Sequence, residues 1–154
     1  MTGRDLQHLM PRMAAYARGT YPAECCGLVI ADATGALRFV PIANIAGTAA
    51  AAGNSERTHR DGYVMDPKAL LAALGEAEQG GGRLAGIVHS HPDAGAYFSR
   101  EDKEMALGGG AEPLWPGVQY LVISCKSTGV DDARLYTWDG ARSDFAEQQV
   151  PVIF

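Results

Sequence analysis

Hydrophobic positions near the N-terminus recur at the spacing of one helix face. The apolar residues between Leu6 and Ala17 lie three or four positions apart, which is typical of an amphipathic helix. Pro11 lies inside this pattern and either kinks the helix or starts its main part. Gly19 is a suitable stop, since glycine readily ends helices. The pattern therefore predicts a helix that turns one face toward a core.

Two further helices are predicted in the middle of the chain. The first covers residues 67–79, with Asp66 as its N-cap and Pro67 as its first residue. The second is shorter and runs from Ser99 to about Leu107. On the longer helix the pattern predicts one apolar face made by Leu70, Leu71 and Leu74.

Runs of apolar or alternating residues predict the strands. They cover residues 26–31, 37–44, 62–66, 83–91, 118–125 and 133–139. Helices and strands alternate irregularly along the chain, which indicates an α/β (α+β) domain with a mixed β-sheet flanked by helices. No linker separates parts of the chain, so we expect one domain over residues 1–154.

Charge and composition exclude several classes of partner. The 154 residues carry a net charge of −5 with no basic run, so a nucleic-acid-binding surface is not expected. No apolar stretch approaches the roughly 20 residues that cross a membrane. Charged and polar residues interrupt the first thirteen positions, where a signal peptide would be apolar. We therefore expect a cytoplasmic protein without membrane contact.

The three cysteines do not form the pattern of a disulfide framework. Cys25 and Cys26 are adjacent and Cys125 is distant, which fits a reducing compartment. The chain has no Cys-x-x-Cys pair, so a structural zinc knuckle is not indicated. Cys25 and Cys26 are interpreted first as small apolar core residues.

Two of the four histidines lie at the end of a predicted strand. His89 and His91 are two positions apart and therefore project from the same face, and Pro92 tends to end the strand there. Two imidazoles on one face supply half of a tetrahedral zinc shell. Taken singly, each could instead be a hydrogen-bonded core histidine.

The predicted helix that follows begins with Ser-x-x-Asp. Ser99 and Asp102 match an ordinary capping arrangement, and Asp102 could also turn inward as a third metal ligand. Two histidines, one carboxylate and an open position are the expected layout of a catalytic zinc. Glu24, just before a buried strand, is the candidate proton acceptor, although its spacing does not place it near the histidines.

These residues together resemble a known motif. Glu24, His89-Ser90-His91-Pro92 and Ser99-x-x-Asp102, with seven residues between His91 and Ser99, are similar to the JAMM motif of the JAB1/MPN/Mov34 metalloproteases. The resemblance is to the small stand-alone bacterial type and covers nearly the whole chain. It implies a curved mixed sheet of the MPN/JAB1, cytidine-deaminase-like architecture. It also implies one catalytic Zn²⁺ held by His89, His91 and Asp102, with Glu24 as general acid/base and Ser99 as donor to the oxyanion.

The resemblance also implies a substrate class. Similar proteins cleave peptide or isopeptide bonds after the C-terminal Gly-Gly tail of ubiquitin-like or sulfur-carrier proteins, and such a tail would lie beside a sheet edge. Arg57, His59 and Arg60 could meet an acidic partner, but we interpret them first as a solvated loop. The oligomeric state stays open, with a homodimer among the alternatives.

Two rival functions remain at this point. A cysteine hydrolase would use Cys25 or Cys26 as nucleophile with a histidine as base, but it leaves Glu24, Ser99 and Asp102 without roles. Such an enzyme would lose activity on thiol alkylation rather than on chelation. A non-catalytic MPN-type scaffold would bind partners only, and the complete set of candidate ligands weighs against it.

Overall fold

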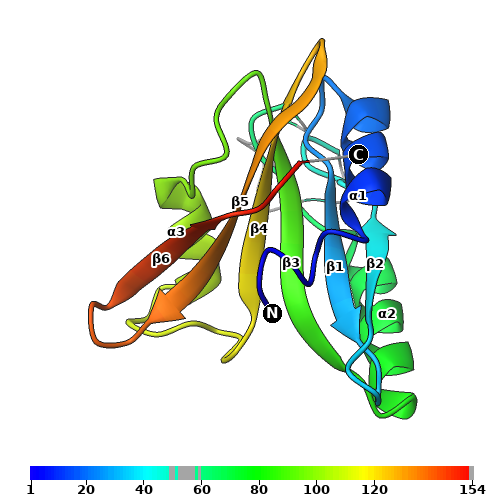
Figure 1. Cartoon of the computed structure of the whole chain (residues 1–154), viewed down its shortest axis with the longest axis vertical. Helices are drawn as coiled ribbons and strands as arrows, with labels where there is room; N and C mark the ends of the chain where they lie inside the picture. Colours follow the sequence, from blue (N-terminus) through cyan, green and yellow to red (C-terminus); the bar gives the residue numbers. More distant parts are fainter. Residues whose placement is uncertain (49–50, 52–57, 59, 153–154) are drawn as a thin grey trace.

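The computed structural model describes residues 1–48, 51, 58 and 60–152. Within these residues, six strands form one mixed sheet (Figure 1). They are β1 (Cys26–Ala31), β2 (Leu37–Ile42), β3 (Arg83–Pro92), β4 (Gln119–Lys126), β5 (Gly129–Asp139) and β6 (Asp144–Gln149). The order across the sheet is β2-β1-β3-β4-β5-β6, and β3 and β4 run parallel while the other neighbours are antiparallel. The predicted fold class is confirmed.

One face of the sheet packs against helix α1 (Met10–Thr20). Met13 and Ala17 of the helix are fully buried with Val29 of β1, Val88 of β3 and Ile123 of β4. Pro11 lies in the first turn of the helix and does not kink it. The helix includes Gly19 and ends at Thr20, so the predicted glycine stop is displaced by one residue.

The other face carries helices α2 (Pro67–Gln79) and α3 (Arg100–Leu107). Figure 1 shows α2 beside β1 and β2, and α3 on the side of β4 to β6. Ile87 of β3 contacts both hydrophobic clusters on this face, one with Ala77 of α2 and one with Ala106 of α3. The end of β3 beyond Ile87 therefore lies between the two helical layers, and it carries both candidate histidines.

Two predictions about the middle of the chain are corrected. Residues 62–66 do not form a strand: they make a single bridge between Asn44 and Met65. The side chain of Asn44 accepts a hydrogen bond from the backbone N–H of Val64, a position at which a neighbouring strand would offer a backbone carbonyl. On α2, Leu70 and Leu74 pack on the sheet, but Leu71 is 69% exposed, because it lies one residue off their helical row.

The C-terminal half contains more strand than predicted. β5 begins at Gly129 rather than at residue 133, and β6 was not predicted. In β6 Phe145 is the buried apolar residue, while Glu147 to Gln149 are exposed, so this edge strand lacks the usual alternating pattern. None of the helices in the described part of the chain has the length and apolar character needed to cross a membrane.

Candidate metal centre

The two histidines of β3 point toward the helix-covered face on which α3 lies. His89 pairs with Cys26 of β1 and Val122 of β4, so it lies in the middle of the sheet and is fully buried. His91 is 8% exposed and lies closer to the surface. Their Nε2 atoms are 3.2 Å apart. The strand thus presents two ring nitrogens to the same point in space.

The start of α3 places the third polar group at this point. Ser99 is the N-cap: its Oγ accepts from the Asp102 N–H at 3.0 Å, and Asp102 Oδ2 accepts from the Ser99 N–H at 2.9 Å. Asp102 Oδ1 lies 3.2 Å from His89 Nε2, and Oδ2 lies 3.3 Å from His91 Nε2. The predicted cap is confirmed, and the same cap orients the carboxylate toward both histidines.

A backbone carbonyl selects the ring orientation of His91. Its Nδ1 lies 2.9 Å from the carbonyl oxygen of Gly95, which can only accept, so Nδ1 carries a hydrogen. In the neutral ring, Nε2 then keeps its lone pair for a metal. Burial lowers the pKa of His91, but the hydrogen bonds to Asp102 and Gly95 outweigh it and raise that pKa. Burial likewise opposes ionisation of Asp102, yet its bonds to His89 and His91 lower its pKa.

The spacing of these donor atoms fits a tetrahedral metal ion. Zinc bonds of about 2.0–2.1 Å to nitrogen and oxygen require tetrahedral ligand atoms about 3.3 Å apart. The 3.2 Å between the two histidine nitrogens matches this requirement, and each nitrogen has one Asp102 oxygen at a similar distance, Oδ1 at 3.2 Å from His89 and Oδ2 at 3.3 Å from His91. Three protein ligands leave a fourth position for a reacting group.

Glu24 offers an alternative carboxylate. One of its oxygens and the two histidine nitrogens also lie within 4.8 Å of one another, so Glu24, His89 and His91 form a second conceivable ligand set. Its Oε1 is 4.0 Å from His91 Nε2, farther than the Asp102 oxygens. These distances favour Asp102 over Glu24 as the third ligand beside the two histidines.

Backbone contacts hold Glu24 in place. On the opposite face of β3 from the histidines, Ser90 Oγ accepts from the Cys25 N–H at 2.8 Å, and the Ser90 N–H donates to the Cys25 carbonyl at 3.0 Å. Asn44 Nδ2 donates to the carbonyl oxygens of Glu24 and Gly62 at 3.0 and 3.1 Å. One amide thus joins the segment that carries Glu24 to the segment that follows residue 60.

The sequence reasoning missed three residues that shape the site. The Asn44 side chain bonds backbone atoms and Gly95 contributes its own carbonyl, and neither residue belongs to the motif. The ring of Tyr63 stacks on His89 with centroids 4.8 Å apart, from a segment predicted as a strand. In the sequence, the one sign of this contact is an aromatic residue directly after Gly62. A single aromatic residue does not reveal which side chain it packs against.

A cavity of about 210 Å³ opens onto the centre. Its lining includes Glu24, His91, Ser99, Asp102 and Arg60. Of the predicted basic cluster, Arg60 is exposed at this cavity, whereas Arg57 and His59 lie outside the described residues. Four of the five predicted site residues therefore line one opening, and the fully buried His89 lies behind it with its Nε2 3.2 Å from both His91 Nε2 and Asp102 Oδ1.

Comparison with known proteins agrees with this arrangement. The family model described as prokaryotic homologs of the JAB domain matches residues 6–137. The chain belongs to this family. The resemblance drawn from the motif is thereby confirmed at the level of the family.

Two curated proteins are similar to this JAB-domain chain. A desampylase of Haloferax volcanii is 29% identical over 138 residues, which are 88% of this chain and 83% of that protein. The tail tip assembly protein K of Escherichia phage N15 is 33% identical over 97 residues, which are 63% of this chain. The aligned part is only 33% of the phage protein.

Two solved structures share the fold. A Desulfitobacterium hafniense protein superposes with a TM-score of 0.65 at 25% identity and covers 92% of this chain and 86% of its own. A Salinibacter ruber protein has a TM-score of 0.57 at 21% identity, with 94% and 87% coverage. The second likeness concerns the fold alone.

In this JAB-domain chain the cysteines are poorly suited to nucleophilic attack. Cys25, Cys26 and Cys125 are all buried free thiols. Burial raises the pKa of Cys25 to about 11, although a hydrogen bond with Ser90 partly offsets it. Burial also raises the pKa of Cys26, whose Sγ lies 3.4 Å from the Ile42 carbonyl. Because the thiolate is the nucleophile, these environments weigh against a cysteine hydrolase.

Proposed function

We propose that this chain is a zinc-dependent hydrolase that cleaves peptide or isopeptide bonds after the Gly-Gly tail of a ubiquitin-like or sulfur-carrier protein. The convergence of His89, His91 and Asp102 at 3.2 to 3.3 Å is the observation that carries the proposal. A buried carboxylate and an opening to solvent adjoin these groups. A non-catalytic scaffold would need neither.

The proposed metal ligands are His89 Nε2, His91 Nε2 and a carboxylate oxygen of Asp102. When bound, zinc supplies Lewis acidity: it polarises a carbonyl oxygen and lowers the pKa of water toward neutrality. The Gly95 carbonyl and the Ser99 N–H support this role, because the first bonds His91 at Nδ1 and so leaves Nε2 to a metal, and the second holds the Asp102 carboxylate through Oδ2.

Glu24 is the proposed general acid/base. Its carboxylate takes a proton from the attacking water and returns it to the amine as the C–N bond breaks, so no covalent enzyme intermediate forms. The Ser99 hydroxyl caps α3 by accepting a hydrogen bond, which leaves its own hydrogen to donate. In the proposed mechanism that hydrogen stabilises the negative charge that develops on the scissile carbonyl oxygen.

The substrate class rests on the similarity to a desampylase over most of the chain. A glycine tail also suits the geometry, because a chain without side chains can approach the centre through a cavity of only about 210 Å³ that is lined by Arg60 and Glu24. The net charge of −5 gives no support to a nucleic-acid substrate.

A cleavage assay with metal removal tests the proposal. The substrate is a ubiquitin-like carrier that ends in Gly-Gly followed by a short peptide, with a lysine-linked version as the isopeptide arm. We expect mass spectrometry to show cleavage after the second glycine, inhibition by 1,10-phenanthroline and recovery on adding zinc.

Replacement of the second glycine by alanine is the matched substrate control, and it should slow cleavage strongly. Cleavage that survives complete removal of metal would contradict the zinc mechanism. Equal cleavage of the glycine and alanine substrates would contradict the proposed tail specificity while leaving the metal chemistry intact.

A further inference from the structure

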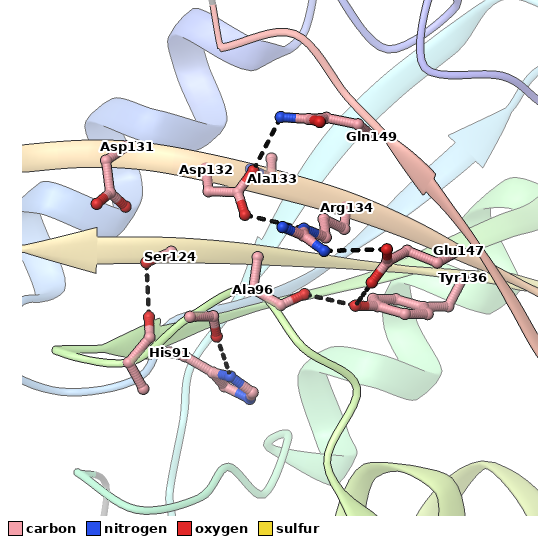
Figure 2. A network of polar contacts seen from close by, with 12 residues as sticks. His91, Ala96, Ser124, Asp131, Asp132, Ala133, Arg134, Tyr136, Glu147 and Gln149 are labelled. Atoms are coloured by element: carbon pink, nitrogen blue, oxygen red, sulfur yellow. Dashed lines mark hydrogen bonds and ion pairs between the residues drawn. The ribbon is translucent and has the colours of Figure 1, made fainter.

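The segment between β3 and α3 has three successive carbonyls that are each bonded by a side chain. At Asp93 the backbone adopts a left-handed conformation with φ of +56°, and the chain turns over the sheet. We call residues 94–96 the carbonyl loop. Figure 2 shows Ser124, His91 and Tyr136 approaching this loop from the sheet.

The distances in the carbonyl loop are short and regular. Ser124 Oγ donates to the Ala94 carbonyl at 2.6 Å, and the Tyr136 hydroxyl lies 2.7 Å from the Ala96 carbonyl. Between them, the Gly95 carbonyl bonds His91 Nδ1 at 2.9 Å. The carbonyl that orients His91 is therefore flanked on both sides by anchors from β4 and β5.

Tyr136 is itself held firmly. Its ring stacks on Phe98 with centroids 5.0 Å apart and an interplanar angle of 18°. Its hydroxyl also lies 3.0 Å from Glu147 Oε1, and Glu147 Oε2 pairs with Arg134 Nη1 at 2.9 Å. The phenol has one hydrogen, which is shared between the Ala96 carbonyl and the Glu147 carboxylate. The pairing with Arg134 balances the Glu147 charge and reduces its competition for that hydrogen.

We propose that Tyr136 and Ser124 are positioning residues for the metal centre: they hold the carbonyl loop so that Gly95 keeps His91 Nε2 turned toward His89 Nε2 and the Asp102 carboxylate. The inference rests on the proposed function, since it concerns the same zinc site. Its physical basis is that partners of a ligating histidine fix both its hydrogen and its ring orientation. Glu147 and Arg134 keep Tyr136 in place from the edge of the sheet.

The test measures zinc affinity rather than turnover. Tyr136→Phe keeps the ring that stacks on Phe98 and removes only the hydroxyl. We expect its zinc dissociation constant, measured by chelator competition, to rise about 10-fold, the lower end for lost partners of metal ligands. Ser124→Ala should act in the same direction, and it tests the other anchor if Tyr136→Phe folds poorly.

Two variants serve as matched controls. Tyr120→Phe makes the same change in the same aromatic cluster, and the Tyr120 hydroxyl has no hydrogen-bond partner within residues 1–48, 51, 58 and 60–152. It should leave the zinc dissociation constant unchanged. Glu147→Gln should also preserve it, because the amide can donate to the phenol oxygen and leave the phenol hydrogen to Ala96.

A spectroscopic readout separates positioning from general instability. The visible absorption of the Co²⁺-substituted protein should change in Tyr136→Phe but not in Tyr120→Phe, because the ring of one ligand is reoriented. If Tyr136→Phe and Ser124→Ala both bind zinc as tightly as wild type, the positioning role is wrong and the proposed function stands. If the wild type does not bind zinc, both proposals are wrong.

Discussion

The candidate centre has two walls that are built in different ways. The ligand wall, His89, His91 and Asp102, comes from one stretch of fourteen positions at the end of β3 and the start of α3. The opposite wall brings together Glu24, Asn44 and residues 60–64 from three distant segments. Neighbouring strands on both sides support the ligand wall. In the opposite wall, one amide side chain bonds all three segments.

Under the proposed function, this difference separates metal binding from catalysis. The ladder of β3 and the capping box of α3 orient the three proposed ligands, and neither uses the Glu24 side chain. Damage to the opposite wall should therefore lower turnover and leave metal in place, whereas damage to the ligand wall should remove both. The following variants test that separation.

The largest effect is expected for His89→Ala. His89 is fully buried and is one of the three proposed ligands, so the variant should lose stoichiometric zinc and at least about 1,000-fold in kcat/KM, since in the proposed mechanism the metal provides the main electrostatic stabilisation. Elemental analysis and the carrier cleavage assay provide the measurements. A variant that retains zinc and activity would show that the ligands lie elsewhere.

Glu24→Gln should lose turnover by about 100- to 10,000-fold, the usual contribution of a positioned general acid/base. The amide keeps the size of the side chain but cannot take up the proton. Steady-state kinetics on the carrier substrate should show the loss in kcat with KM little changed. Full turnover in this variant would assign the proton transfer to another group.

Asn44→Asp should have an intermediate effect. The carboxylate keeps both acceptor contacts, to the N–H groups of Ala46 and Val64, but cannot donate to Glu24 and Gly62. We expect kcat to fall about 10- to 100-fold through misplacement of Glu24, and the free energy of unfolding to fall by about 1–3 kcal/mol. Zinc content should stay at the wild-type value.

Thr48→Ala is the control for that prediction. It removes a side-chain bond to the Ile45 carbonyl in an exposed part of the same region, without touching the segment that carries Glu24. Its kcat should equal the wild-type value. An equal loss in both variants would mean that the whole region, rather than the Asn44 amide, positions Glu24.

Thiol alkylation should have the smallest effect. Because burial raises the pKa of Cys25 to about 11, its thiol is protonated at neutral pH, and the reactive thiolate becomes abundant only as the pH rises toward 11. Iodoacetamide at pH 7 should leave the cleavage rate unchanged. Rapid inactivation at pH 7 that follows modification of Cys25 or Cys26 would revive the cysteine mechanism.

The sequence predicted the elements whose signals are local. The buried strands around residues 26–31, 83–91 and 118–125 have long apolar runs, and the Asp66 and Ser99 caps mark the starts of α2 and α3. β6 was missed because Phe145 is its one buried apolar side chain. Residues 62–66 looked like a strand because their apolar pattern does not reveal that Asn44 occupies the pairing position.

The sequence predicted those residues of the candidate site whose side chains have a recognisable chemistry, such as a metal ligand or a proton acceptor. The motif pointed to Glu24, His89 and Asp102, and the structure brings these groups together. Asn44 and Tyr136 were missed because they act on carbonyl oxygens, which every residue has. Their partners depend on which segments the fold brings side by side.

The most direct test of the two-wall account is the zinc content of two purified variants, Glu24→Gln and Asp102→Asn, measured side by side. Both exchange a buried carboxylate for an amide of the same size. The account predicts one zinc per chain in Glu24→Gln and substantial loss of zinc in Asp102→Asn. Retention in Asp102→Asn with loss in Glu24→Gln would contradict it, since Glu24, His89 and His91 would then be the ligands.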